Sequence, residues 1–230
     1  MLDIKRRVGT ALLDILVSRR GYRVMRDLAY GPHRRQKLDF YIPKGLNAPA
    51  PVILFFYGGS WQSGDKIWYR AFGEAFTSKG IIVAIADYRL YPEDLYPAFV
   101  EDSALALRFV RDQAVGRGGD PARLFLAGHS AGAYNAMMIV CDPRYLRELG
   151  GDPSWVRGLV GISGPYDFLP LKEDKLIEIF GGDRRVESQP ITYVDRACPP
   201  MLLVAGSKDR TVSWKNTRRM AAKLREFGTD

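Results

Sequence analysis

The stretch LFLAGHSAGAYNAMMI, residues 124–139, passes from a run of apolar residues through a glycine-flanked serine to a run of small and apolar residues. The first part predicts a buried strand and the last part predicts a helix. At its centre, GHSAG (residues 128–132) matches the pattern G-x-S-x-G. A sharp turn between strand and helix holds such a serine in a strained conformation, and its flanking glycines are needed because side chains there would collide with neighbouring elements. The pattern therefore indicates that Ser130 is a displayed nucleophile.

Strands and helices alternate on both sides of this stretch. Apolar or alternating runs predict strands at residues 36–43, 52–57, 81–88, 123–128, 156–163 and 201–206. Helical patterns lie at residues 67–79, 98–115 and 213–227, besides the helix that follows Ser130. Strands that alternate with helices predict the α/β class, with a mostly parallel central sheet and helices on both faces.

Two segments differ from this regular pattern. Residues 36–43 alternate apolar and polar side chains and end at a proline, which predicts an edge strand. Residues 164–198 interrupt the alternation with prolines, glycines and one short helix. Because ligands bind at the edge where parallel strands end, we expect this second segment to be a short cap insertion over that edge.

The length and charge of the chain limit its organisation. Its 230 residues fit one domain, and residues 1–44 carry eleven Lys and Arg against four acidic residues, so most of the net charge of +8 lies there. We expect a basic N-terminal helical segment at 1–37 and one domain at 38–230. The apolar stripe of that segment either packs on the domain or makes peripheral contact with an anionic membrane. No recognised nucleic-acid-binding module accompanies the charge, so we do not expect nucleic acid as a partner.

Other motifs set the expected compartment and chemistry. No apolar run approaches the ~20 residues that cross a bilayer, and no signal-peptide cleavage site follows the N-terminal stripe, so we expect a cytoplasmic protein. Cys141 and Cys198 form no CxxC pair and are expected to be reduced thiols. The stretch GRGGDP (116–121) fails the dinucleotide pattern and precedes a strand, so we expect no cofactor, and we expect no metal.

A second glycine-rich turn, FFYGGSW (55–61), follows another predicted buried strand. Paired glycines leave backbone N–H groups uncovered, and acyl transfer requires such donors aimed at the oxygen that becomes an oxyanion. We expect the N–H groups of Gly59 and Ser60, together with that of Ala131 after the nucleophile, to form the oxyanion hole.

The order of these motifs points to a known superfamily. FFYGGSW is followed by DYRLYPEDLYPAFVED (87–102) and then by GHSAG. This order resembles the α/β-hydrolase superfamily, and within it the hormone-sensitive-lipase-like and feruloyl-esterase-like carboxylesterases. The resemblance covers residues 38–228 and implies the α/β-hydrolase fold and the hydrolysis of small carboxylic esters through an acyl-enzyme on Ser130. It also makes Asp209, in VAGSKDRTV (204–212), the acid of a catalytic triad.

The chain departs from the family pattern at one position of the oxyanion loop. Where the family has a histidine that shapes this loop, the sequence has Tyr57, whose hydroxyl can hydrogen-bond in its place. The resemblance makes Asp87, Arg89 and Asp102 structural residues that fix loops beneath the site. From their position near the same sheet edge, we expect the aromatic residues Tyr57, Trp61 and Tyr134 to line the substrate pocket.

The histidine base of the triad is missing from the expected place. In the family it lies on a loop after one more strand beyond the acid. The sequence has two histidines: His129, expected to point below the sheet edge, and His33, which precedes the first predicted strand. We therefore expect the base, with a C-terminal strand and helix, to lie beyond residue 230 of a truncated chain. Loss of a triad member lowers kcat by roughly 10⁴–10⁶, so the chain as printed is expected to be almost inactive.

Two other functions remain open at this point. The same groups would hydrolyse an amide in an arylformamidase-type enzyme, and a substrate panel separates esters from formamides. A catalytically silent binding protein of the same fold is the alternative outside enzymes, and it would lack a histidine after Asp209 even in its natural form.

Overall fold

The computed structural model describes residues 21–229 of the chain. The N-terminal apolar stripe and its proposed membrane contact lie outside these residues. Among the residues described, no helix is long and apolar enough to cross a membrane.

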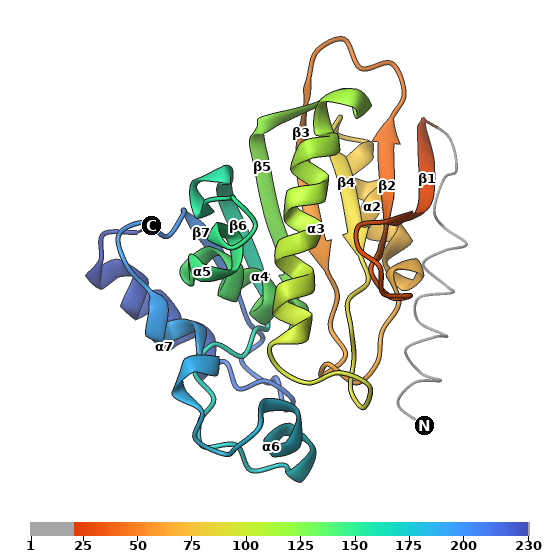
Figure 1. Cartoon of the computed structure of the whole chain (residues 1–230). Coiled ribbons are helices and arrows are strands. Elements are labelled where there is room, and N and C mark those ends of the chain that lie inside the picture. Colours follow the sequence, from red (N-terminus) through yellow and green to blue (C-terminus); the bar gives the residue numbers. More distant parts are fainter. Residues whose placement is uncertain (1–20, 230) are drawn as a thin grey trace.

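A seven-stranded mixed sheet forms the centre of the described chain, in the order β1-β2-β4-β3-β5-β6-β7 (Figure 1). Strands β3 to β7 pair in parallel, whereas β2 pairs antiparallel with both β1 and β4. The strands are β1 (Tyr22–Ala29), β2 (Lys37–Pro43), β3 (Ala50–Phe56), β4 (Ile82–Ala86), β5 (Gly119–His129), β6 (Val156–Ile162) and β7 (Met201–Val204).

Helices cover both faces of this sheet. α3 and α4 contact each other on one face, and α2 packs against β2 and β4 on the opposite face (Figure 1). α7 packs beside β7, and α6 lies beyond the ends of the parallel strands. The α-helices are α2 (Arg70–Thr77), α3 (Ala98–Ala114), α4 (Ala131–Cys141), α5 (Arg144–Arg147), α6 (Asp174–Phe180) and α7 (Lys215–Glu226). Five 3₁₀ turns complete the list: Lys66–Tyr69, Val115–Arg117, Pro153–Trp155, Val186–Ser188 and Pro190–Tyr193.

The predicted class is confirmed, and the burial of the strands explains why the sequence was informative. All five residues of β4 are buried, as a continuous apolar run between two helical layers requires. α4 is likewise buried along its whole length, so it lies between the sheet and the other helices of its face. The core therefore runs through the middle of the sheet, directly below the GHSAG turn.

Two expectations near the N-terminus are wrong. Residues 22–29, expected within a helical segment, form β1, which pairs with β2 from Tyr22 opposite Pro43 to Ala29 opposite Lys37. β2 is therefore not an edge strand, because β1 and β4 flank it on either side. Arg23 and Arg26 made this stretch resemble the basic helical segment. They are compatible with a strand because most residues of β1 are half-buried or exposed.

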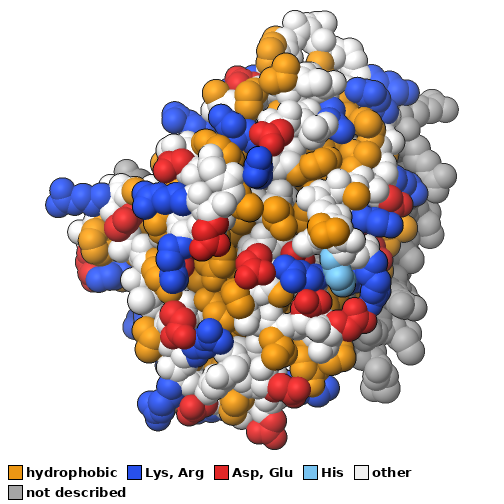
Figure 2. Space-filling view, in the orientation of Figure 1, with side chains coloured by type: hydrophobic (Ala, Val, Ile, Leu, Met, Phe, Trp, Pro, Cys, Tyr) orange, Lys and Arg blue, Asp and Glu red, His pale blue; other side chains and the backbone are white. Residues whose placement is uncertain are grey.

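The surface in Figure 2 intersperses Lys and Arg with Asp and Glu side chains. Nucleic-acid-binding proteins gather their positive charge in a patch or stripe. The face in Figure 2 carries no such stripe.

Candidate active site

Ser130 lies in the turn between β5 and α4 with φ 53° and ψ −121°, a conformation that costs free energy for a residue with a side chain. Its backbone N–H donates to the carbonyl of Ile162 on the neighbouring strand β6 at 2.8 Å. Its carbonyl accepts from the N–H groups of Ala133 and Tyr134 at 3.0 and 3.1 Å, which begins the helix. These bonds hold the strained turn that GHSAG predicts.

The glycines on either side of Ser130 allow this turn. A Cβ atom added to Gly132 would lie 2.1 Å from the carbonyl oxygen of Phe56, and one added to Gly128 would lie 2.4 Å from that of Gly132. Backbone atoms cannot move aside cheaply, so both positions exclude every residue but glycine. The close approach also presses α4 against the end of β3, where the second glycine-rich turn begins.

That second turn lies directly against the serine. A Cβ atom added to Gly58 would be 2.8 Å from the Cβ of Ser130. Gly59, Ser60 and Trp61 all have positive φ, at 150°, 53° and 58°. The carbonyl of Gly59 accepts from two N–H groups of the following residues, which closes the turn. The loop is thereby coiled tightly beside the predicted nucleophile.

The three N–H groups expected to form the oxyanion hole are free in the described part of the chain. The N–H groups of Gly59 and Ser60 donate to no acceptor within residues 21–229. Ala131 is the first residue of α4, where the helix provides no acceptor for the N–H. Ser60 and Ala131 both border the pocket that Ser130 opens into. Gly59 is not among the lining residues, so Ser60 and Ala131 are the predicted donors that border the pocket beside Ser130.

The pocket at this site has a volume of about 590 Å³. One wall comes from residues 165–176, within the segment expected to be a cap insertion, and the opposite side comes from the loop after β7 and from α7. Arg219 forms an ion pair with Asp167 across its rim. The sequence indicated this segment as an insertion, but its pocket-lining residues were not predicted, although its apolar side chains could have indicated them. The apolar lining residues are Trp61, Ala131, Pro165, Phe168, Leu169, Pro170, Leu171, Leu176 and Val212.

The aromatic residues expected to line the pocket are placed differently. Trp61 lines it and donates its indole N–H to the side-chain oxygen of Asn135 at 3.0 Å. Tyr57 and Tyr134 are fully buried and outside the lining, which corrects the expectation for both. The hydroxyl of Tyr134 donates to the carbonyl of Ser188 at 2.7 Å, so this ring points into the core below the pocket wall.

Tyr57 belongs to a hydrogen-bonded group that joins the two ends of the oxyanion loop. This group, called the clasp below, consists of Arg35, Tyr57, Lys66 and Asp87. Its hydroxyl donates to Oδ1 of Asp87 at 2.6 Å, and the same oxygen accepts from the backbone N–H of Lys66 at 3.0 Å. One carboxylate oxygen therefore bonds Tyr57, in the first half of the loop, and Lys66, which follows the loop. Arg35 donates to the Tyr57 hydroxyl at 2.7 Å and to the carbonyl of Gly64 at 3.1 Å.

The charges of this clasp compensate one another. The ammonium group of Lys66 lies 3.0 Å from Oδ2 of Asp87 and 2.9 Å from Asp27. Burial alone would lower the pKa of Lys66, but the two carboxylates raise it overall, so the lysine stays charged. Burial, with Asp87 alongside, raises the pKa of Tyr57, so its hydroxyl remains a donor. Through Asp87, Tyr57 is thus tied to Lys66 beyond the other end of this loop.

Replacing Asp87 with alanine is expected to destabilise the protein by about 3 kcal/mol, because it leaves Lys66 and the Tyr57 hydroxyl without their shared partner. For a chain of this length, that change lowers Tm by roughly 6–12 °C in a thermal melt. Asp112→Ala is the matched control, since it removes a carboxylate from an exposed pair with Arg108 and should cost under about 0.5 kcal/mol. Equal Tm values for the two variants would contradict the clasp.

Asp209 lies on the loop after β7, next to the pocket. Its Oδ1 accepts from the N–H groups of Thr211 and Val212 at 2.8 and 3.0 Å, and both of those residues line the pocket. The Val212 N–H and, with it, the Thr211 N–H and the Ser163 hydroxyl lower the pKa of the Asp209 carboxyl below its usual value. Ser163 directly follows β6, the strand beside β5, so the carboxylate lies one strand away from the nucleophile turn.

Neither histidine of the sequence lines the pocket. Nδ1 of His129 lies 3.4 Å from the hydroxyl of Tyr69, and a Cβ added to Gly58 would meet this nitrogen at 3.0 Å. The ring therefore lies beneath the oxyanion loop. His33 is on the loop before β2, where Nε2 is 4.0 Å from Oδ2 of Asp94.

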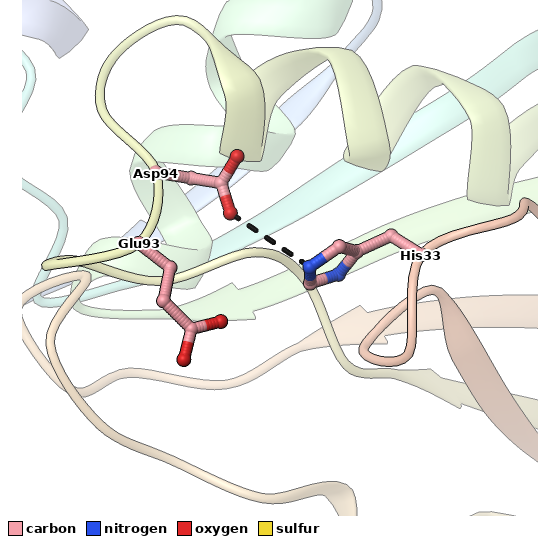
Figure 3. A group of neighbouring side chains, drawn as sticks. All are labelled: His33, Glu93 and Asp94. Atoms are coloured by element: carbon pink, nitrogen blue, oxygen red, sulfur yellow. Dashed lines mark ion pairs between the residues drawn. The ribbon is translucent and has the colours of Figure 1, made fainter.

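His33, Glu93 and Asp94 form a surface cluster that offers three ligand atoms within 4.8 Å of one another (Figure 3). Both carboxylates already have cationic partners, because Arg34 pairs with Glu93 and Arg89 lies 3.5 Å from Asp94. Positive charge beside the carboxylates opposes the binding of a cation. We therefore assign no metal to this cluster.

Solved structures with a similar fold define the class of the chain. A carbohydrate esterase from gut microbiota, solved in truncated form, superimposes with a TM-score of 0.80 at 21% identity and covers 93% of this chain and 87% of its own. Thermogutta terrifontis esterase 2, solved in a form phosphoramylated by tabun, has a TM-score of 0.76 at 25% identity. The match covers 92% of this chain and 81% of that esterase chain. The fold is therefore that of the α/β-hydrolases, as expected.

The chain belongs to the BD-FAE family, whose model matches residues 38–224. Among curated proteins it is 29% identical over 229 residues to a probable isoprenylcysteine alpha-carbonyl methylesterase of Arabidopsis thaliana, covering 89% of this chain and 48% of the relative. It is 31% identical over 232 residues to esterase LipC of Mycobacterium tuberculosis, and the match covers 90% of this chain and 56% of LipC. The chain thus spans about half the length of the curated relatives it matches.

Proposed function

We propose that this chain carries the nucleophile and oxyanion hole of a serine carboxylesterase. Ser130 attacks the carbonyl carbon of an ester, and the N–H groups of Gly59, Ser60 and Ala131 stabilise the negative charge that forms on the carbonyl oxygen. The alcohol leaves, and water then releases the acid from the acyl-enzyme. The observation that carries this proposal is a strained serine that opens into a pocket beside free backbone donors.

The comparisons support an ester as the substrate. Relatives and structural neighbours bear the names esterase and methylesterase, and one neighbour is modified by tabun, an organophosphorus compound. The pocket wall suits an apolar acyl or alcohol group of small to medium size, because the lining includes Trp61, Phe168 and Leu171. No observation favours an amide substrate over an ester.

We propose Asp209 as the triad acid and, as the base, a histidine other than His33 and His129. The Asp209 carboxylate stays ionised because three hydrogen-bond donors favour its charged form, as an acid that stabilises an imidazolium requires. Both His33 and His129 are outside the pocket. β7 is an edge strand of the described sheet, and its Leu202 and Val204 are 60% and 44% exposed.

Added imidazole tests this arrangement in the 230-residue chain. We expect slow hydrolysis of p-nitrophenyl acetate that rises about tenfold with imidazole, since a positioned base contributes 10²–10⁴ and a free one recovers part of that. The Ser130→Ala variant corrects for hydrolysis by imidazole in solution and should show no protein-dependent increase. An increase of equal size in both proteins would contradict Ser130 as the nucleophile. Imidazole-dependent cleavage of formanilide, without cleavage of the ester, would instead support the amide alternative.

A further inference from the structure

Two cysteines 57 residues apart in the sequence meet in the interior. Cys141 is the last residue of α4, and Cys198 lies shortly before β7 begins at Met201. Their sulfur atoms are 3.4 Å apart, and the two residues are only 2% and 7% exposed. No short-range pattern in the sequence connects these two thiols, so their pairing could not be predicted from it.

Both cysteines are held in place by their surroundings. Cys141 belongs to a helix that is buried along its whole length, and its sulfur also lies 3.6 Å from the sulfur of Met137. Cys198 follows a turn in which Asp195 accepts from its N–H at 3.3 Å and from that of Ala197 at 2.8 Å. A disulfide has an S–S length of about 2.05 Å, so the two sulfurs, now 3.4 Å apart, need to approach by about 1.4 Å.

We propose that Cys141 and Cys198 are a disulfide-forming pair that a small-molecule disulfide such as oxidised glutathione can oxidise. The Cys198 thiolate attacks one sulfur of the oxidant, and one glutathione thiolate leaves. The Cys141 sulfur then displaces the second glutathione from the mixed disulfide. Two electrons pass from the cysteine sulfurs to the oxidant, and the two protons end on the two glutathione thiols.

The asymmetry of the pair supports Cys198 as the attacking sulfur. The hydrogen bond with Cys141 lowers the pKa of the Cys198 thiol, whereas the same bond and burial raise the pKa of Cys141. The thiolate is the reactive form, so the first ionised sulfur is that of Cys198. It is also the more exposed of the two.

The bond would close a loop that contains the pocket wall. Between Cys141 and Cys198 the chain forms β6 and then the segment 165–176 that lines the pocket. Oxidation would tie the end of this loop to α4, the helix that begins directly after Ser130. The proposal does not depend on the catalytic role of that serine.

Oxidative refolding tests the pair. The reduced, unfolded 230-residue chain is refolded in glutathione buffers of increasing oxidised fraction, trapped with N-ethylmaleimide and digested for mass spectrometry. We expect a peptide cross-linked between Cys141 and Cys198, two hydrogens lighter than its reduced parts, in a monomer. A bond that closes a loop of this length should raise Tm by roughly 8–15 °C, and dithiothreitol should reverse the rise.

Cys198→Ser and Cys141→Ser serve as controls. Because neither can form the bond, the Tm of each should not rise with the oxidised fraction of glutathione. Alkylation of both cysteines after equilibration with oxidised glutathione would overturn the proposal. Separate glutathione adducts on both, or a cross-link found only between two molecules, would overturn it as well.

Discussion

Replacing Ser130 with alanine in the natural-source protein is expected to lower kcat for ester hydrolysis by roughly 10⁴–10⁶ and to leave KM almost unchanged. The variant keeps the turn, because backbone bonds to Ile162, Ala133 and Tyr134 hold it. It lacks the oxygen that forms the acyl-enzyme, so only the oxyanion hole and the pocket contribute. Steady-state kinetics with p-nitrophenyl esters measure the loss.

Ser78→Ala is the matched control for this serine. Ser78 is exposed at the end of α2, where its hydroxyl donates to the carbonyl of Ala75 at 2.7 Å. Its removal changes local stability slightly and should leave kcat unchanged. A Ser130→Ala protein that retains more than about 1% of kcat would show that another group carries the reaction.

The Asp209→Asn variant is expected to lower kcat by about 10⁴, the effect known for loss of charge at a triad acid. The asparagine oxygen can still accept from the N–H groups of Thr211 and Val212, so the loop keeps its shape. Its amide cannot stabilise the imidazolium ion that forms during the reaction. Thermal melts should be nearly unchanged, which separates a catalytic loss from a structural one.

The pH profile gives a second test of Asp209. Its carboxyl pKa is lowered by neighbouring donors, so the folded form holds the charge above that lowered value and loses it only in stronger acid. The acidic limb of kcat/KM near neutral pH should therefore report the histidine and not this carboxylate.

Asp152→Asn is the matched control for Asp209→Asn, because Asp152 accepts from the N–H of Ser154 at 2.9 Å in a similar turn. Equal kcat values for the two variants would contradict the triad role.

Short-range patterns predicted the frame of this site well. The GHSAG turn follows from five consecutive residues and a buried strand, because the steric conflict that requires Gly128 and Gly132 arises within this turn and with the adjacent strand. The parallel order of the sheet followed equally from alternating strands and helices. The cap segment was visible as a break in that alternation.

The sequence did not predict which side chains are buried below the site, or which distant residues contact one another. Tyr57 and Tyr134 lie near the predicted edge of the sheet. Whether each ring faces the pocket or the core, however, depends on partners far away in the sequence. Tyr57 is drawn inward by Arg35 and Asp87, which lie 22 and 30 residues away. α4 is buried on all sides, so its sequence has no period that separates pocket from core.

Labelling with a fluorophosphonate tests whether Ser130 is the nucleophile. The natural-source protein is incubated with the reagent, and its intact mass and the peptide that holds residues 124–139 are measured. We expect one phosphonyl group per chain, attached to Ser130, and no labelling after denaturation. A native protein that takes up no label, or that is labelled at another residue while losing its esterase activity, would contradict the assignment of Ser130 as the nucleophile.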